Sequence, residues 1–252
     1  MRPLTTSLTL LCALGLATGA HAFEPAGEDV SYDIGDDTFE GYFASGGDMA
    51  RGTVLIVHDW NGLDDYERQR ADMLAALGYD AFAVDLFGQG NRPKTTEARQ
   101  EATNALYSDR ERMRELTLGG LAEARDRGAA TSTLVMGYCF GGTVALEIAR
   151  SGQADDVVGY TSFHGGLGTP EDQSWPEDTP PLLIAHGGAD TAVPMADVAT
   201  LVEELEDAEL TYTVEIYSGA PHAFSVFDTE RYQERADKAS WAAFTDFLEE
   251  IL

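Results

Sequence analysis

Leu-Val-Met-Gly-Tyr-Cys-Phe-Gly-Gly, residues 134–142, is the stretch that decides the fold of this chain. A short apolar run ends in Gly-x-Cys-x-Gly-Gly, and an apolar pattern with helical spacing follows from Thr143 to Ala149. This order predicts a buried strand, a sharp turn with Cys139 at its tip, and a helix whose N-terminus points at that tip, an arrangement called a nucleophile elbow. The helix dipole would favour the thiolate, which is the reactive form of cysteine. From this stretch alone, a reactive thiol and a buried structural cysteine both remain open.

The N-terminal segment, residues 1–22, has the composition of a secretory signal peptide. Arg2 gives it a positive charge, residues 8–17 form a short apolar core, and Ala20-His21-Ala22 fits a cleavage site. The apolar part is too short to span a membrane. We therefore expect a single mature domain, residues 23–252, that is periplasmic or secreted.

The two cysteines of the chain are Cys12 and Cys139, and Cys12 lies inside the predicted signal peptide. Cys139 would then be the only cysteine of the mature protein. Because an unpaired thiol in an oxidising compartment has to be either protected or useful, export favours the interpretation of Cys139 as a functional thiol.

Acidic residues dominate the charge balance: the chain has 44 Asp and Glu against 16 Lys and Arg, and a formal charge of −28. A negative field of this size opposes binding to nucleic acid or to an anionic membrane surface, so we expect neither partner. A saline habitat, where counterions screen the repulsion, and ordinary solubility both account for such a surface.

Short apolar runs and amphipathic stretches alternate along the chain from residue 53 onward. This alternation predicts one α/β domain with a mostly parallel sheet and helices on both faces, preceded by an antiparallel hairpin. The predicted strands are residues 30–34, 38–44, 53–57, 81–85, 133–136, 157–160, 182–185 and 211–217. Since ligands bind at the carboxyl ends of parallel strands, the polar loops that follow these runs should converge.

Three of those loops carry residue types that nucleophilic catalysis needs. Cys139 lies at the elbow, Asp190 follows the run 182–185, and His222 follows the run 211–217. The order nucleophile, acid, histidine is the chain order of α/β-hydrolases. His222 would take the thiol proton, and Asp190 would orient the imidazole and favour its charged form. Alone, His222 could be a surface histidine and Asp190 a turn residue, but their joint order favours a catalytic triad.

These residues resemble the dienelactone hydrolase family of the α/β-hydrolase superfamily, over essentially the whole chain from about Val30. The specific anchors are the elbow 137–142, His186-Gly187-Gly188-Ala189-Asp190 with Val193-Pro194, and residues 219–224, Gly-Ala-Pro-His-Ala-Phe. The resemblance implies a Cys139–His222–Asp190 triad.

The resemblance implies two further parts of the site. Asp59 stands where the family usually has a glutamate that interacts with the resting thiol; a loop aspartate in water is the other interpretation. The superfamily pattern places the oxyanion hole at the backbone N–H groups of Phe140 and Trp60.

The substrate is less clearly indicated. Family members that act on dienelactone carry two arginines that face the substrate carboxylate. One lies in the loop after the fourth strand, where this chain has Gln89 with Arg92 displaced along the loop, and the other lies where this chain has Val226. We expect Tyr138, Phe163 and Phe224 to contact a neutral or weakly polar acyl group, although aromatic residues at such positions are often core packing.

No metal or cofactor is expected, because no histidine pair has the spacing of a zinc motif and cysteine-dependent hydrolysis needs none. The sequence thus predicts a hydrolase, monomeric or a small homo-oligomer, that cleaves small carboxylic esters or lactones through an acyl-thioester intermediate. A thioesterase or acyl-transfer enzyme, and a non-catalytic binding or redox-sensing protein on the same scaffold, remain as alternatives.

Overall fold

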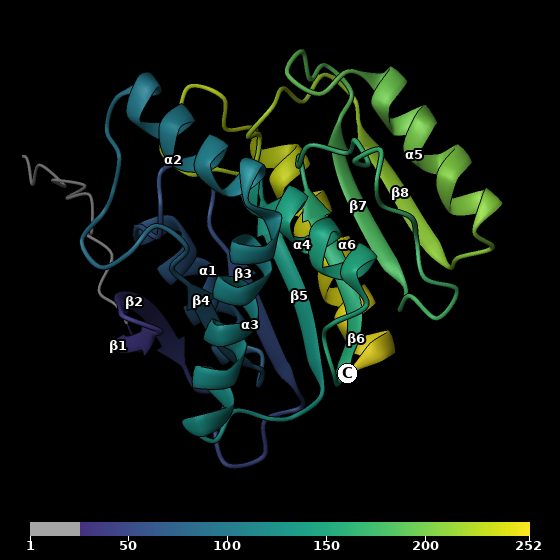
Figure 1. The fold of residues 1–252 in the computed structure, drawn as a ribbon. Helices are drawn as coiled ribbons and strands as arrows, with labels where there is room; N and C mark the ends of the chain where they lie inside the picture. Colours follow the sequence, from purple (N-terminus) through teal and green to yellow (C-terminus); the bar gives the residue numbers. More distant parts are fainter. Residues whose placement is uncertain (1–25) are drawn as a thin grey trace, which may run out of the picture.

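The computed structural model describes residues 26–252, and over these residues the chain builds one eight-stranded sheet with helices on both faces (Figure 1). The strands are β1 Glu28–Ile34, β2 Asp37–Ala44, β3 Thr53–Val57, β4 Asp80–Val84, β5 Thr133–Tyr138, β6 Val157–Phe163, β7 Leu182–Gly187 and β8 Tyr212–Tyr217. The helices are α1 Asp65–Ala76, α2 Thr96–Ser108, α3 Arg110–Asp126, α4 Phe140–Ser151, α5 Met195–Asp207 and α6 Glu234–Ile251. The predicted signal peptide, residues 1–22, lies outside the described residues.

The strand order across the sheet is β1-β2-β4-β3-β5-β6-β7-β8. β1 pairs antiparallel with β2, and β2 pairs antiparallel with β4, whereas every pair from β4 to β8 is parallel. The parallel strands place their carboxyl ends at one edge of the sheet. β3 is the first of these strands along the chain, and it lies next to β5, the strand that precedes the elbow. The predicted fold class, an antiparallel hairpin followed by a mostly parallel sheet, is confirmed.

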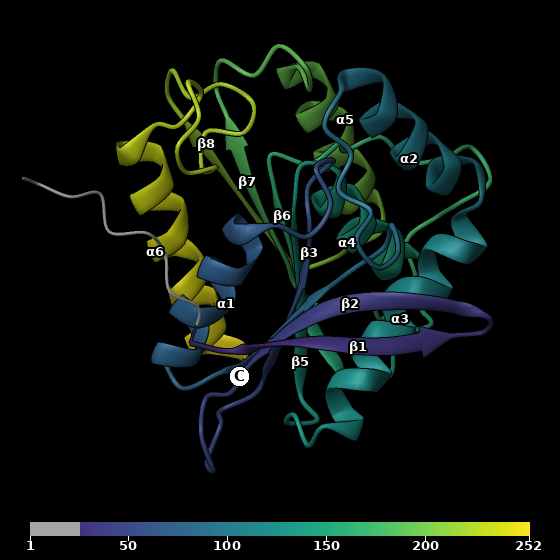
Figure 2. The ribbon, with the colours of Figure 1, turned by 90° about the vertical axis from the view of Figure 1, so that its left-hand side faces the viewer.

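Two apolar cores lie on opposite faces of the sheet, because consecutive residues of a strand point to opposite sides. One core packs under α3, α4 and α5, and the other packs under α1 and α6 (Figure 2). In β5, Val135 belongs to the first core, while Leu134, Met136 and Tyr138 belong to the second. The central strands β3 and β4 are buried along their whole length, which explains their continuous apolar sequence.

Within residues 26–252, no helix combines the length and apolar character that crossing a bilayer requires.

Candidate active site

The elbow after β5 holds Cys139 in a strained backbone conformation, with φ 53° and ψ −112°. Non-glycine residues rarely occupy this region, and the surrounding contacts have to impose it. The Cys139 N–H donates to the carbonyl of Phe163 over 3.0 Å, and the Cys139 carbonyl accepts from Thr143 N–H over 3.3 Å. Neighbouring strands and helix α4 therefore fix the tip of the turn.

Close backbone packing explains the glycines of the elbow. A Cβ atom on Gly137 would lie 2.2 Å from the carbonyl carbon and oxygen of Gly141. A Cβ on Gly141 would lie 2.1 Å from the carbonyl oxygen of Val57 at the end of β3. Helix α4 thus packs directly against the end of β3, and this contact brings the loop after β3 to the elbow.

The structure brings the three predicted triad side chains together. His222 Nε2 lies 3.1 Å from Cys139 Sγ, and His222 Nδ1 lies 2.8 Å from Asp190 Oδ2. The second carboxylate oxygen of Asp190 accepts hydrogen bonds from the backbone N–H groups of Ala192 and Val193, over 2.8 and 2.9 Å. Asp190 is fixed by the turn that begins α5, and it in turn fixes the imidazole of His222.

The electrostatics of this chain favour a charged His222. Burial by itself lowers the pKa of His222, but the hydrogen bonds with Asp190 and Cys139 outweigh it and raise the pKa to about 10. Burial raises the pKa of the Asp190 carboxyl, yet its hydrogen bonds with His222 and Val193 bring the pKa below the ordinary value. The His222 imidazolium therefore contacts the Asp190 carboxylate through one ring nitrogen and the Cys139 sulfur through the other.

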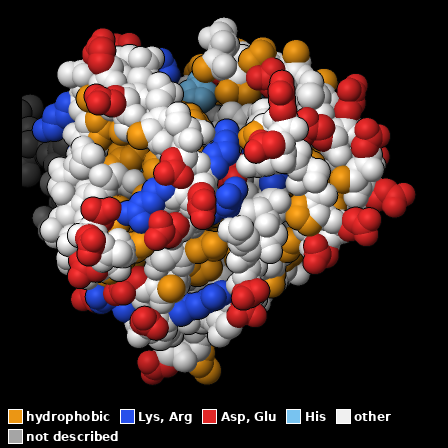
Figure 3. Space-filling model, in the orientation of Figure 1, with side chains coloured by type: hydrophobic (Ala, Val, Ile, Leu, Met, Phe, Trp, Pro, Cys, Tyr) orange, Lys and Arg blue, Asp and Glu red, His pale blue; other side chains and the backbone are white. Residues whose placement is uncertain are grey.

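His222 is also the described histidine that solvent reaches, since His58, His164 and His186 are fully buried. The space-filling view shows a histidine side chain in a hollow of the surface (Figure 3). The side chain of His222 is 15% exposed.

Asp59 lies in the loop after β3, but its carboxylate is not hydrogen-bonded to the thiol. Asn61 holds both carboxylate oxygens, through its backbone N–H over 2.6 Å and its side-chain amide over 3.0 Å. Burial raises the pKa of Asp59 to about 7. The turn to Asn61 therefore engages both oxygens of the Asp59 carboxylate.

Backbone N–H groups of the predicted oxyanion hole are present at the same edge. Phe140 is the first residue of α4, so its N–H has no carbonyl partner within the helix. No described residue accepts a backbone hydrogen bond from Trp60, which lies in the loop after β3.

The expectation that Tyr138, Phe163 and Phe224 contact substrate is wrong. Tyr138 and Phe224 are 0% exposed and Phe163 is 1% exposed. All three belong to the core under α1 and α6, and the Tyr138 ring packs on Phe163 with centroids 4.9 Å apart. The residue before the nucleophile points to the opposite face of the sheet from the one that α4 covers, because side chains alternate along β5.

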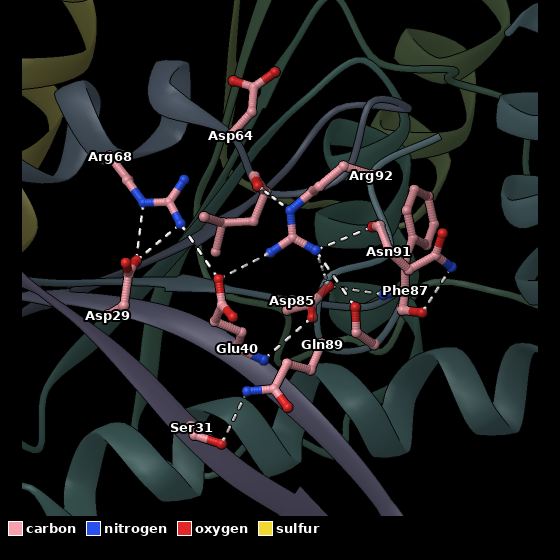
Figure 4. A network of polar contacts seen from close by, with 12 residues as sticks. Asp29, Ser31, Glu40, Asp64, Arg68, Asp85, Phe87, Gln89, Asn91 and Arg92 are labelled. Carbon is pink, nitrogen blue, oxygen red and sulfur yellow. Dashed lines mark hydrogen bonds and ion pairs between the residues drawn. The ribbon is translucent and has the colours of Figure 1, made fainter. Parts of the chain in front are cut away.

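Arg92, which is displaced along the loop from the position of the family's arginine, is held by contacts with its surroundings. Arg92 Nη1 lies 3.5 Å from Asp85 and donates to backbone carbonyls of its own loop (Figure 4). The Gln89 side chain turns towards Ser31 of β1 in the same view. Val226 is 7% exposed and lines a cavity of about 480 Å³ next to Asn61 and Arg92.

Two residues of α2 lie near the site but were not predicted from the sequence. The guanidinium of Arg99 stacks over the Trp60 ring at 5.4 Å, and its charge lowers the pKa of Asp59 against the effect of burial. The Tyr107 ring packs edge-on against Phe140 with centroids 5.5 Å apart. Both lie on a helix that follows an irregular loop, so spacing in the sequence did not reveal that they return to the site.

Comparison with known proteins gives one family for this chain. The dienelactone hydrolase family model matches residues 39–252. A carboxymethylenebutenolidase from Pseudomonas putida is 28% identical over 214 residues, which covers 77% of this chain and 84% of that enzyme. A carboxymethylenebutenolidase homolog from Mus musculus is 28% identical over 180 residues, which covers 68% of this chain and 69% of the relative.

Solved structures show the same architecture. A dienelactone hydrolase-like promiscuous phosphotriesterase from metagenomic libraries superposes with a TM-score of 0.78 at 24% identity, which covers 89% of this chain and 98% of that one. At this identity the likeness establishes the fold alone. The family match over residues 39–252 establishes more: the chain belongs to the dienelactone hydrolase family.

Proposed function

We propose that this protein hydrolyses small carboxylic esters or lactones through a Cys139–His222–Asp190 triad. Membership of the family makes it a hydrolase of ester or lactone bonds. Two contacts support the triad: His222 Nε2 lies beside Cys139 Sγ, and His222 Nδ1 lies beside the buried carboxylate of Asp190. The three side chains supply a nucleophile, a proton acceptor and an orienting group in the geometry that acyl transfer requires.

The proposed reaction has two halves. The Cys139 thiolate attacks the carbonyl carbon, and the N–H groups of Phe140 and Trp60 stabilise the oxyanion that forms. As the carbon–oxygen bond to the leaving group breaks, the His222 imidazolium donates its proton to the departing alkoxide. His222 then takes a proton from water, and the resulting hydroxide attacks the thioester carbonyl. The carbon–sulfur bond breaks, the carboxylic acid leaves, and Cys139 is regenerated.

Alkylation of Cys139 tests the thiolate–imidazolium pair. Since the pKa of His222 is raised to about 10, the imidazolium persists through neutral pH and stabilises a thiolate beside it. Iodoacetamide reacts with the thiolate, so at pH 7 it should label wild type faster than His222→Gln. Equal labelling rates for the two proteins at pH 7 would exclude the pair.

Arg99 gives the proposal a testable substrate preference. Its guanidinium lies over the ring of Trp60, whose N–H belongs to the proposed oxyanion hole, and we propose that it meets a carboxylate on the acyl group. Arg99→Gln should raise KM roughly tenfold for esters that carry a carboxylate, which corresponds to one lost charged hydrogen bond. KM for neutral esters of the same size should not change. Steady-state kinetics on matched pairs of esters measures this difference.

Arg51 offers a matched control for the loss of one positive charge. It lies just before β3, at the opposite end of that strand from Asp59, and its side chain is 43% exposed. Arg51→Gln should leave both KM values unchanged. An equal rise in KM for charged and neutral esters in Arg99→Gln would show that Arg99 does not recognise the carboxylate.

A further inference from the structure

A buried histidine that the proposed reaction does not use lies directly beside His222. His164 follows β6, is 0% exposed, and its ring centre lies 5.4 Å from that of His222 with the planes 65° apart. His164 also has a positive φ of 41°, a conformation that the surrounding contacts have to impose. The buried ring of His164 and its strained backbone, next to the candidate base His222, need a physical explanation.

Hydrogen bonds connect His164, at the end of β6, to two other parts of the fold. His164 Nε2 lies 2.8 Å from Ser225 Oγ, and Ser225 Oγ lies 3.0 Å from the hydroxyl of Tyr66 on α1. Ser225 is fully buried and stands three positions after His222 in the same loop. The chain of contacts therefore ties the loop of His222 to the end of β6 and to α1.

Arg70 closes the chain at the other end. Its Nε donates to the Tyr66 hydroxyl over 3.3 Å, and its Nη2 donates to the backbone carbonyl of Ser225 over 3.1 Å. The guanidinium is 1% exposed, forms an ion pair with Asp237 of α6, and lies 4.3 Å from the Phe227 ring centre. Two helices thus hold this arginine in one position.

The donor character of Arg70 sets the direction of the first hydrogen bond in the chain and favours one direction for the others. Arginine can only donate, so the Tyr66 oxygen accepts from Arg70 and the Tyr66 proton is available for Ser225. The Ser225 proton then goes to His164 Nε2. In this arrangement each hydroxyl proton has an acceptor. It places the proton of the neutral His164 ring on Nδ1, a buried atom that has no hydrogen-bond partner among the described residues.

A neutral His164 suits its place beside a charged His222. Burial, together with the charge of His222, lowers the pKa of His164 well below its ordinary value. His164 Nε2 is engaged by Ser225, while both ring nitrogens of His222 are engaged by Asp190 and Cys139, so the two rings meet without a hydrogen bond between them. His164 fills the space beside His222 without repelling the imidazolium.

We propose that Tyr66, Ser225 and His164 form a positioning chain that holds the imidazole of His222 against Cys139. The inference rests on the proposed cysteine-dependent hydrolysis, because it assigns these residues to the geometry of that pair. None of them touches the substrate in this proposal, so each acts through His222 as a positioning residue.

The test compares two Tyr→Phe variants that lose the same atom. Tyr66→Phe removes the hydroxyl that orders the chain. Tyr232→Phe removes a hydroxyl that only donates to Asp237 on its other oxygen, over 3.1 Å, outside the chain. Tyr66→Phe should lower kcat about tenfold with KM within twofold of wild type, and should lower the rate of iodoacetamide labelling at pH 7. Tyr232→Phe should match wild type in both measurements.

Thermal unfolding separates positioning from a general loss of structure. If Tyr66→Phe lowers the melting temperature, Ser225→Ala removes a second hydroxyl of the same chain, and kcat and the labelling rate are measured at a temperature where both variants are folded. A Tyr66→Phe enzyme and a Ser225→Ala enzyme that both keep the wild-type kcat and labelling rate would overturn the inference while leaving the proposed function intact. Equal labelling of wild type and His222→Gln at pH 7 would overturn the proposed thiolate–imidazolium pair, and the inference with it.

Discussion

Cys139→Ala should lower kcat/KM for small aryl esters and lactones by about four orders of magnitude or more, the scale seen when a catalytic nucleophile is removed. The elbow presents one nucleophilic atom, Cys139 Sγ, to His222, and no described hydroxyl takes its place in the contact with His222 Nε2. Without it, hydrolysis depends on the oxyanion donors and on bound water alone. Initial rates on a panel of esters and lactones measure the loss.

Cys139→Ser serves as the matched variant for this prediction. It keeps an atom with a lone pair at the tip of the elbow and needs no change of backbone, but a hydroxyl ionises far less readily than a thiol. We expect its activity to lie between those of wild type and Cys139→Ala, with a stronger dependence on His222 acting as a base. Equal rates for wild type and Cys139→Ala across the whole panel would contradict the proposed function.

Gly141→Ala should cost about 3 kcal/mol of unfolding free energy or more, the upper part of the range for overpacking a close-packed interior. The added Cβ would lie 2.1 Å from the Val57 carbonyl oxygen and 2.7 Å from that of His58, and both are backbone atoms. Only a separation of α4 from β3 can relieve these contacts. For a chain of this size the melting temperature should fall by roughly 10 °C.

The same substitution should also remove activity in the protein that remains folded. Moving α4 away from β3 increases the distance between the N–H groups of Phe140 and Trp60, which together form the proposed oxyanion hole. Thermal unfolding followed by circular dichroism gives the stability, and ester turnover below the transition gives the activity. Gly168→Ala is the control, since a Cβ at Gly168 meets nothing within 4 Å. A Gly141→Ala protein as stable and active as Gly168→Ala would show that the elbow does not depend on this contact.

The sequence predicted the sheet and the line from Cys139 to Asp190 well, for a physical reason. Strands buried on both faces need continuous apolar runs, and such runs are visible as 53–57 and 182–185 without any knowledge of the fold. The carboxyl ends of parallel strands meet at one edge, so residues that follow different strands converge even when they are far apart in the chain. That rule places Cys139, Asp190 and His222 together.

The surroundings of the site were harder to predict, because they depend on the direction of side chains. Alternation along β5 puts Tyr138 in the same core as Met136, and this period of two could have shown that Tyr138 turns away from the thiol. Arg99 could not be found in this way, since the path of the loop between β4 and α2 decides which turn of the helix comes back to the site. Asp59 was placed correctly in its loop, but its partner Asn61 was not foreseen.

The conformation of Cys139 has a consequence for how this protein can change over generations. A backbone with φ 53° and ψ −112° stores about 1–3 kcal/mol in a residue with a Cβ, and glycine would release most of that free energy. Selection for heat tolerance alone would therefore favour glycine at the position where the proposed reaction needs sulfur. Thermostable descendants that keep cysteine there would have to gain their stability elsewhere, and the survival of this residue would record continuous selection for its reactivity.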